Sequence, residues 1–134
     1  MSTFSLKIVT PDGLEFEGEA EQLTVRTTSG DIGILAGHIN CVAPLGMGQA
    51  VIVTDGQRKY AACIGGLLSV NSGKVTLVPT TFEWAHEIDV ARAEASEQRA
   101  HRILDRKDAS ATDLRLAEAR LHRALVRKSV AARR

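Results

Sequence analysis

Two patterns of hydrophobic and polar residues divide this chain. Up to about residue 80, short stretches that alternate between apolar and polar residues are separated by glycine, proline, asparagine and aspartate, which is typical of strands joined by tight turns. Asp55-Gly56, at the centre of residues 51–60, suits the positive φ angles of a hairpin turn. The predicted strands cover residues 6–10, 16–20, 22–26, 41–45, 51–60 (a hairpin), 61–64, 67–70 and 74–78.

Turns this frequent predict an antiparallel β sandwich or a flattened barrel. We expect about eight to ten short antiparallel strands in an N-terminal domain over residues 1–84. Pro79 is expected at the end of its last strand.

The pattern after residue 80 is helical. Residues 80–134 contain neither glycine nor proline and are rich in Ala, Glu and Arg, which are strong helix formers. Asp89 is suited to cap a helix that runs to about Leu104, and Ser110 or Thr112 is suited to cap a second one over about residues 113–130. The sequence therefore predicts a C-terminal domain over residues 85–134, an antiparallel two-helix hairpin with a loop at residues 105–112.

The apolar stripes of these two helices are thin. Alanine permits close helix approach but buries little area, so the seam between the helices contributes limited hydrophobic stabilisation. We therefore expect the hairpin to be detachable, or to depend on a partner or a ligand. The predicted stripes consist of Ala93, Ala100, Ile103 and Leu104 in the first helix and Leu114, Ala117, Leu121, Ala124 and Leu125 in the second.

Composition narrows the class of protein. The chain is 44% apolar, as in a globular protein, and no apolar run is long enough to cross a bilayer. The N-terminus lacks the basic and apolar regions of a secretion signal. Cys41 and Cys63 have no framework spacing, which favours two small buried hydrophobes in a reducing, cytosolic setting.

Catalytic chemistry is not indicated in the first domain. No nucleophile has a plausible base beside it, and Gly30-Asp-Ile-Gly33 lacks the spacing of a dinucleotide fingerprint. His38 and Cys41 are three residues apart and could share a metal with Cys63, but no convincing fourth ligand follows. We predict no metal site and no enzyme.

Arginines form the second pattern of the tail. Residues 1–88 carry five Lys/Arg against nine Asp/Glu, whereas residues 89–134 carry twelve against seven. Arg92 and Arg99 share one side of the first helix, and Arg120, Arg123 and Arg127 share one face of the second. Converging guanidiniums fit phosphate or carboxylate oxygens, although a solvated basic face is the alternative that composition alone favours.

A basic hairpin also raises the hypothesis of a nucleic-acid-binding protein. Against it, the carboxylates of the tail lie among its basic residues, aromatic side chains for stacking are absent after Trp84, and the overall net charge is only +1. We therefore predict no nucleic-acid partner.

Four motifs carry a resemblance to a known family. They are Gly30-Asp-Ile-Gly-Ile-Leu-Ala-Gly-His38 followed by Leu45 and Gly48, Gly65-Gly66-Leu67-Leu68-Ser69-Val70, Val75-Thr-Leu-Val78, and the junction Ile88-Asp-Val-Ala-Arg-Ala93. In order and spacing, over nearly the whole chain, they resemble the epsilon subunits of bacterial F-type ATP synthases.

The resemblance implies a non-catalytic rotor subunit. Its sandwich would contact the gamma subunit and the c-ring of a proton- or sodium-translocating ATP synthase, with Asp31 and His38 as candidate rotor contacts. Such a subunit couples rotation to ATP synthesis and is peripheral to the cytoplasmic face of the bacterial cell membrane. Its hairpin, when extended towards the alpha and beta subunits, would oppose ATP hydrolysis.

The resemblance also implies ATP as a regulatory ligand of the folded hairpin, with no required cofactor and with the role of Mg²⁺ left open. It favours a phosphate site over a solvated face. Phe82, Trp84 and His122 depart from the family's usual residue types, as does Pro79. The ATP-binding residues implied are Glu83, Ile88, Asp89, Arg92, Ala93, Arg99, Arg123 and Arg127.

Overall fold

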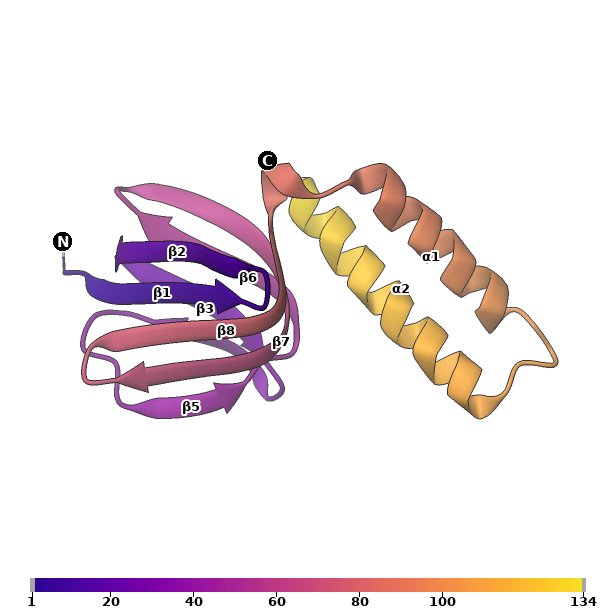
Figure 1. The fold of residues 1–134 in the computed structure, drawn as a ribbon, viewed down its shortest axis with the longest axis horizontal. Helices are drawn as coiled ribbons and strands as arrows, with labels where there is room; N and C mark the ends of the chain where they lie inside the picture. The colour runs from indigo at the N-terminus through magenta and orange to yellow at the C-terminus, as the bar shows by residue number, and fades with distance from the viewer. Residues whose placement is uncertain (1, 134) are drawn as a thin grey trace. The chain divides into compact units, whose positions relative to one another are not determined.

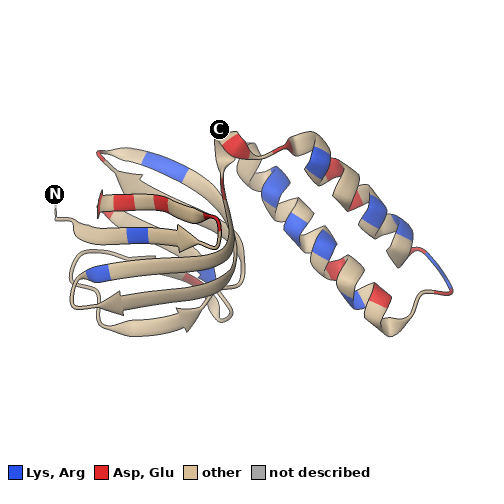
Figure 2. Cartoon of the chain, viewed as in Figure 1, with Lys and Arg blue, Asp and Glu red and all other residues tan. Residues whose placement is uncertain are grey.

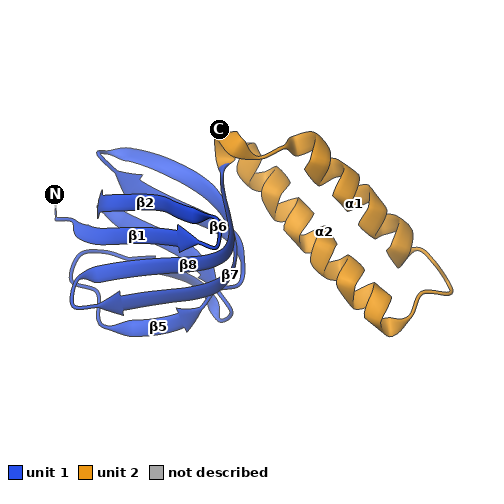
Figure 3. Cartoon of the chain, in the orientation of Figure 1, with its two compact units in different colours: residues 1–84 blue, residues 85–134 orange. Residues whose placement is uncertain are grey.

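The computed structural model describes residues 2–133. The chain divides into two compact units, Met1–Trp84 and Ala85–Arg134, coloured separately in Figure 3. The first unit is built of strands and the second of helices (Figure 1).

Eight strands form the first unit and confirm the predicted β sandwich. They hydrogen-bond in the order β2-β1-β8-β7-β6-β3-β4, and β5 pairs with β7. The strands are β1 (Phe4–Thr10), β2 (Gly13–Ala20), β3 (Gln22–Thr27), β4 (Gly30–Ile34), β5 (Cys41–Pro44), β6 (Met47–Thr54), β7 (Gln57–Asn71) and β8 (Lys74–Trp84).

One strand pair departs from the antiparallel expectation. β1 and β8 run parallel, with Leu6 opposite Val75 and Ile8 opposite Leu77. No hairpin joins these two strands, because six other strands lie between them in the sequence, so the connection does not impose an antiparallel direction. The strand β4 was also missed, since two of its five residues are glycines and it lacks the usual strand signal.

The sheet curls on itself around one apolar core. In β1 the buried positions alternate, so that Phe4, Leu6 and Ile8 point inward. Figure 1 shows β3 and β6 lying behind β1 and β8. Leu23 of β3 and Ile52 of β6 belong to the same buried cluster as the β1 residues, so two layers enclose the core.

The β7–β8 hairpin is longer than the sequence predicts. Residues 61–64 and 67–70 belong to one strand, because Gly65 and Gly66 take positive φ angles of 68° and 99° without ending it. Pro79 lies within β8, opposite Gly66, and does not end the strand as expected. A Cβ at Gly66 would collide with the Val78 carbonyl oxygen and lie 2.7 Å from the Pro79 Cα. Glycine is therefore required where the two strands approach.

The second unit confirms the predicted helical hairpin. It comprises η1 (Ala85–Glu87), α1 (Val90–Leu104) and α2 (Ala111–Ala131). As predicted, Asp89 caps α1, and its carboxylate accepts from the Arg92 backbone N–H at 3.0 Å. Ser110 caps α2 in a reciprocal box with Asp113, so α2 begins two residues earlier than its predicted start.

An alanine seam joins the two helices. Ala93 and Ala100 of α1, and Ala117, Ala124 and Ala131 of α2, are buried at intervals of seven residues. The larger stripe residues are only half-buried. The inclusion of Leu125 in the stripe was wrong: it is 45% exposed, because the position after Ala124 is turned about 100° away from the seam.

Both cysteines are free thiols in this structure. Burial raises the pKa of the Cys63 thiol to about 12, so Cys63 packs as a small hydrophobe and stays protonated at neutral pH. Cys41 is half-buried. Among residues 2–133, no helix combines the length and the apolar character that a membrane crossing requires.

We expect Gly66→Ala to lower the free energy of unfolding of the first unit by about 2–4 kcal/mol, from the backbone collision and the positive φ together. Urea unfolding followed by circular dichroism measures this loss. The matched control is Gly73→Ala in the β7–β8 turn, which shares a positive φ of 81° but has open space around the added Cβ. It should cost about 1–2 kcal/mol. Equal costs at the two positions would contradict the close-approach argument.

Candidate anion-binding site on the helical hairpin

One ion pair joins the two helices of the hairpin. The Lys128 ammonium of α2 donates to Glu97 Oε1 of α1 at 2.7 Å, although the residues are 31 positions apart. Each of these residues follows a seam alanine by four positions, Ala93 in α1 and Ala124 in α2. In an antiparallel pair, equal rotations away from the seam bring side chains to the same side of the hairpin. The close contact of Glu97 with Lys128 agrees with this geometry.

The arginines lie on the other side of the hairpin. Arg92 and Arg99 each precede a seam alanine of α1 by one position, and Arg123 precedes Ala124 in the same way. Arg120 and Arg127 precede seam alanines of α2 by four positions, a rotation of about 40° in the same sense. We call this side the arginine face; it consists of Arg92, Arg99, Arg120, Arg123 and Arg127.

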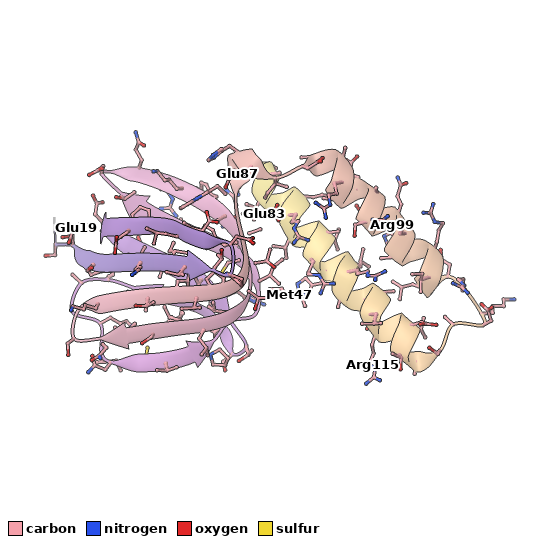
Figure 4. The ribbon with its side chains drawn as sticks, in the orientation of Figure 1. Glu19, Met47, Glu83, Glu87, Arg99 and Arg115 are labelled. Atoms are coloured by element: carbon pink, nitrogen blue, oxygen red, sulfur yellow. The ribbon has the colours of Figure 1, made fainter. Side chains whose placement is uncertain are left out.

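The arginine face extends along both helices. Arg92 and Arg99 are seven positions apart on α1, and Arg120 and Arg127 are seven positions apart on α2, about 10 Å along each axis at 1.5 Å per residue. Figure 4 shows Arg99 on α1, and Arg115 of α2 directed away from α1.

Carboxylates are separated from this face. Glu94 and Glu97 are on the side of Lys128, where Glu97 also contacts the imidazole of His101 at 3.7 Å. The two carboxylates rotated towards the arginine face, Asp89 and Asp113, accept backbone N–H groups at the helix starts. Figure 2 shows basic residues along both helices. The arginine face therefore concentrates positive charge that an anion would neutralise.

The other residues that the resemblance implies for ATP binding lie in different environments. Ile88 and Ala93 are buried, with 3% and 4% of their surfaces exposed, so they contribute packing. Asp89 acts as the helix cap. Glu83 lies in β8, opposite Ala62 of β7, and belongs to the first unit. Arg123 and Arg127 are half-buried, whereas Arg92 and Arg99 are exposed. The structure thus gathers the four arginines of the set on one face.

The two candidate rotor contacts lie at or after β4. Asp31 accepts from the Arg26 guanidinium at 3.4 Å, and both side chains are more than half exposed. His38 follows β4 in a loop, where its backbone N–H donates to the Leu35 carbonyl at 3.1 Å. The neighbouring Leu35 and Ile39 are 59% and 77% exposed. This loop presents polar and apolar side chains together.

An apolar stripe crosses the outer surface of the sheet, and sequence reasoning missed it. Leu67 of β7 lies opposite both Pro44 of β5 and Val78 of β8, on the side that faces away from the core. The available signal was an apolar residue at Leu67 where the alternation calls for a polar one. We define the apolar stripe as Leu14, Val42, Leu67 and Val78, whose exposed fractions are 57%, 70%, 51% and 46%.

His38, Cys41 and Cys63, the residues weighed against a metal site in the sequence, form no ligand cluster within residues 2–133. Within residues 2–133, the structure brings together no group of three or more His, Cys, Asp or Glu side chains that could hold a metal ion. His38 and Cys41 flank the start of β5, whereas Cys63 points into the core.

Comparison with known proteins identifies relatives of the whole chain. Residues 3–85 match the family model of the ATP synthase delta/epsilon chain β-sandwich domain, and residues 86–132 match that of its long α-helix domain. Proteins named ATP synthase epsilon chain from Ruminococcus albus and Bacillus velezensis are each 44% identical, over 98% of this chain and 98% of their own length.

Solved structures share the fold. A chain in the mitochondrial ATP synthase of Euglena gracilis superposes with a TM-score of 0.84 at 21% identity, covering 100% of this chain and 83% of that one. A chain in the central stalk and c-ring structure of Tetrahymena thermophila gives 0.63 at 12% identity, covering 95% of each. The family match confirms the resemblance drawn from the sequence and the expectation of a non-catalytic chain: the chain belongs to the ATP synthase delta/epsilon chain family.

Proposed function

We propose that this chain is a central-stalk rotor subunit of a proton- or sodium-driven F-type ATP synthase, and that its hairpin regulates ATP hydrolysis by binding ATP. The family membership supports the stalk role. The observation that carries the regulatory role is the arginine face, where both helices contribute guanidiniums to one side. A site of this kind exists only while α1 and α2 lie together.

Electrostatics make the closed hairpin sensitive to a polyanion. The arginine face brings guanidinium groups of both helices to one side of the hairpin, where like charges repel one another. The phosphates of ATP would replace this repulsion with charge-assisted hydrogen bonds. A ligand that binds only the closed state stabilises it by about 2.7 kcal/mol at a hundredfold excess over its Kd. An alanine seam is weak enough for that energy to decide the conformation.

The open hairpin would serve the inhibitory role. Residues 89–134 carry twelve Lys/Arg against seven Asp/Glu, so an extended tail would be attracted to acidic surfaces of the alpha and beta subunits. ATP and these acidic surfaces would compete for the same arginines. High ATP would then favour the closed hairpin and release hydrolysis from inhibition.

The first unit would attach the chain to the rotor. The apolar stripe exposes four large aliphatic side chains on one sheet surface, which is typical of a permanent protein interface. We assign it to the gamma subunit. Asp31 and His38, at or after β4, offer polar groups suited to the water-exposed loops of the c-ring. Through these contacts the chain would be held peripherally at the cytoplasmic face of the membrane.

The first expected outcome is ATP binding by the isolated chain. Isothermal titration should show binding of one ATP, and Arg99→Ala or Arg123→Ala should weaken it about tenfold each, since each removes a charged partner of the phosphates. The control is Arg115→Ala, on α2 but directed away from α1, which should change affinity by less than about twofold. Absence of heat at millimolar ATP would refute the ligand role and leave the stalk role standing.

The second expected outcome concerns the assembled ATP synthase. Arg123→Ala removes a contact that ATP uses to hold the hairpin closed, so the extended form gains population. ATP hydrolysis at millimolar ATP should fall severalfold, as measured by a coupled assay, while the Arg115→Ala complex keeps the parent rate. Equal hydrolysis by the Arg123→Ala and parent complexes would contradict regulation through this face.

The third expected outcome tests the apolar stripe. Leu67→Ser and Val78→Thr each remove exposed apolar surface, so the chain should stay folded while binding to purified gamma subunit weakens about tenfold or more. Surface plasmon resonance measures the affinity. The matched control is Leu116→Ser, an equally exposed leucine of α2. An unchanged gamma affinity in both stripe variants would move the interface elsewhere on the sandwich.

A further inference from the structure

We propose that Glu97 and Lys128 form a latch: their ion pair holds α1 against α2 without any ligand, and it opposes the charge repulsion of the arginine face on the other side of the hairpin. Closure of the hairpin then depends on two electrostatic contributions of opposite sign. This inference rests on the proposed function in one respect, that the hairpin opens, and it does not require ATP to bind.

The latch is shorter and better shielded than other ion pairs of this chain. The Lys128 ammonium donates to Glu97 Oε1 at 2.7 Å, and the exposed fractions of the Glu97 and Lys128 side chains are 20% and 35%. The Arg26–Asp31 and Arg106–Asp108 pairs are 3.4 Å long, and their side chains are more than half exposed. Water and salt screen such exposed pairs, so they contribute little, whereas a shielded charge-assisted hydrogen bond contributes more.

The two side chains meet because the helices are antiparallel. Each Cα–Cβ bond of an α-helix tilts towards the N-terminus of that helix, so Glu97 leans towards the start of α1 and Lys128 towards the start of α2. Lys128 lies in the last turn of α2, and Glu97 lies in the middle of α1. The long side chains therefore lean towards one another across the seam, and their contact does not require the two residues to be level.

The surroundings of the pair favour its charged form. Glu97 also contacts the His101 imidazole at 3.7 Å through its other carboxylate oxygen, and Glu94 attracts Lys128. The hydrogen bond from Lys128 lowers the pKa of the Glu97 carboxyl, and the same bond raises the pKa of the Lys128 ammonium. The lowered pKa stabilises closure above the ordinary pKa of glutamate, and the raised pKa stabilises it below that of lysine. The latch therefore keeps its strength across the neutral range.

Opening of the hairpin removes the latch but leaves each helix intact. The caps at Asp89 and Ser110 accept backbone N–H groups of their own helices, so they do not depend on contact between α1 and α2. The seam alanines contribute little hydrophobic stabilisation, and the arginine face opposes closure. Under these conditions the loss of one shielded ion pair changes the open population measurably.

A thiol placed in the seam measures the open population. Ala117 is only 1% exposed, so a thiol introduced by Ala117→Cys becomes accessible to a chromogenic disulfide reagent when the helices separate. The labelling rate follows the open population as long as the hairpin closes faster than the reagent reacts. All variants also carry Cys41→Ser. Cys63 contributes little labelling, because it is 2% exposed and burial raises its pKa to about 12.

Loss of the latch should speed labelling in the absence of ATP. Glu97→Gln/Lys128→Gln leaves the net charge unchanged, and labelling should be at least about threefold faster than in the parent. Glu97→Lys and Lys128→Glu should each speed it further, because each brings like charges together. The combined Glu97→Lys/Lys128→Glu restores opposite charges and should return the rate to within about twofold of the parent.

The matched control removes an ion pair that does not join the helices. Arg106→Gln/Asp108→Asn, within the connecting loop, should keep the labelling rate of the parent. An unchanged rate in Glu97→Gln/Lys128→Gln would overturn the latch, and so would an equal acceleration in the loop variant. A combined charge reversal that labels as fast as the single reversals would also overturn it.

Addition of ATP separates the latch from the proposed ligand role. Because the latch and the arginine face lie on opposite sides, millimolar ATP should slow labelling by a similar factor in the parent and in Glu97→Gln/Lys128→Gln. Faster labelling in the latch variant, with no slowing by ATP in either chain, supports the latch and refutes the ligand role. Slowing by ATP, with equal labelling of the two chains before ATP is added, supports the ligand role and overturns the latch.

Discussion

The seam of alanines between α1 and α2 is the constraint on which the second unit depends. Ala93 and Ala100 face Ala117, Ala124 and Ala131, and each buries little more than a methyl group, worth about 0.8 kcal/mol. Close approach of the helices is gained at the expense of hydrophobic stabilisation. Polar contacts at the edges of such a seam therefore carry a larger share of the closing free energy than they do in an ordinary helix pair.

The first unit solves its packing differently. Leu6, Ile8 and Leu77 are wholly buried, and a single apolar cluster joins both layers of the sandwich. Its outer surface, in contrast, carries apolar side chains that remain exposed, among them Leu67 and Val78. A sandwich that is complete inside and apolar outside is suited to permanent attachment. A hairpin with a thin seam is suited to a change of state.

Sequence reasoning succeeded where local chemistry decides structure. Asp89 and Ser110 cap the helices because their side chains reach backbone N–H groups within the first turn, which spacing alone reveals. It failed where contacts between residues distant in the sequence decide the structure. The parallel β1–β8 pair, the passage of β8 through Pro79, and the apolar stripe all depend on strands that meet only in three dimensions. The prediction that Leu125 lies in the buried stripe was wrong for a third reason. A narrow apolar stripe does not show how far around the helix it extends.

Prediction of the candidate site also succeeded for local features and failed for contacts between distant residues. The helical spacing of Arg120, Arg123 and Arg127 predicts a shared face on α2, but it does not say which arginine of α1 lies opposite. That choice requires the axial register of the two helices, which depends on contacts across the hairpin and not on the spacing within one helix. The Glu97–Lys128 ion pair, which no motif singled out, lies on the other side of the hairpin from the arginine face, so a phosphate bound among the arginines does not compete with it for either charge. The contact that joins the helices and the ligand that would hold them closed can therefore act together, and each stabilises the geometry that the other needs.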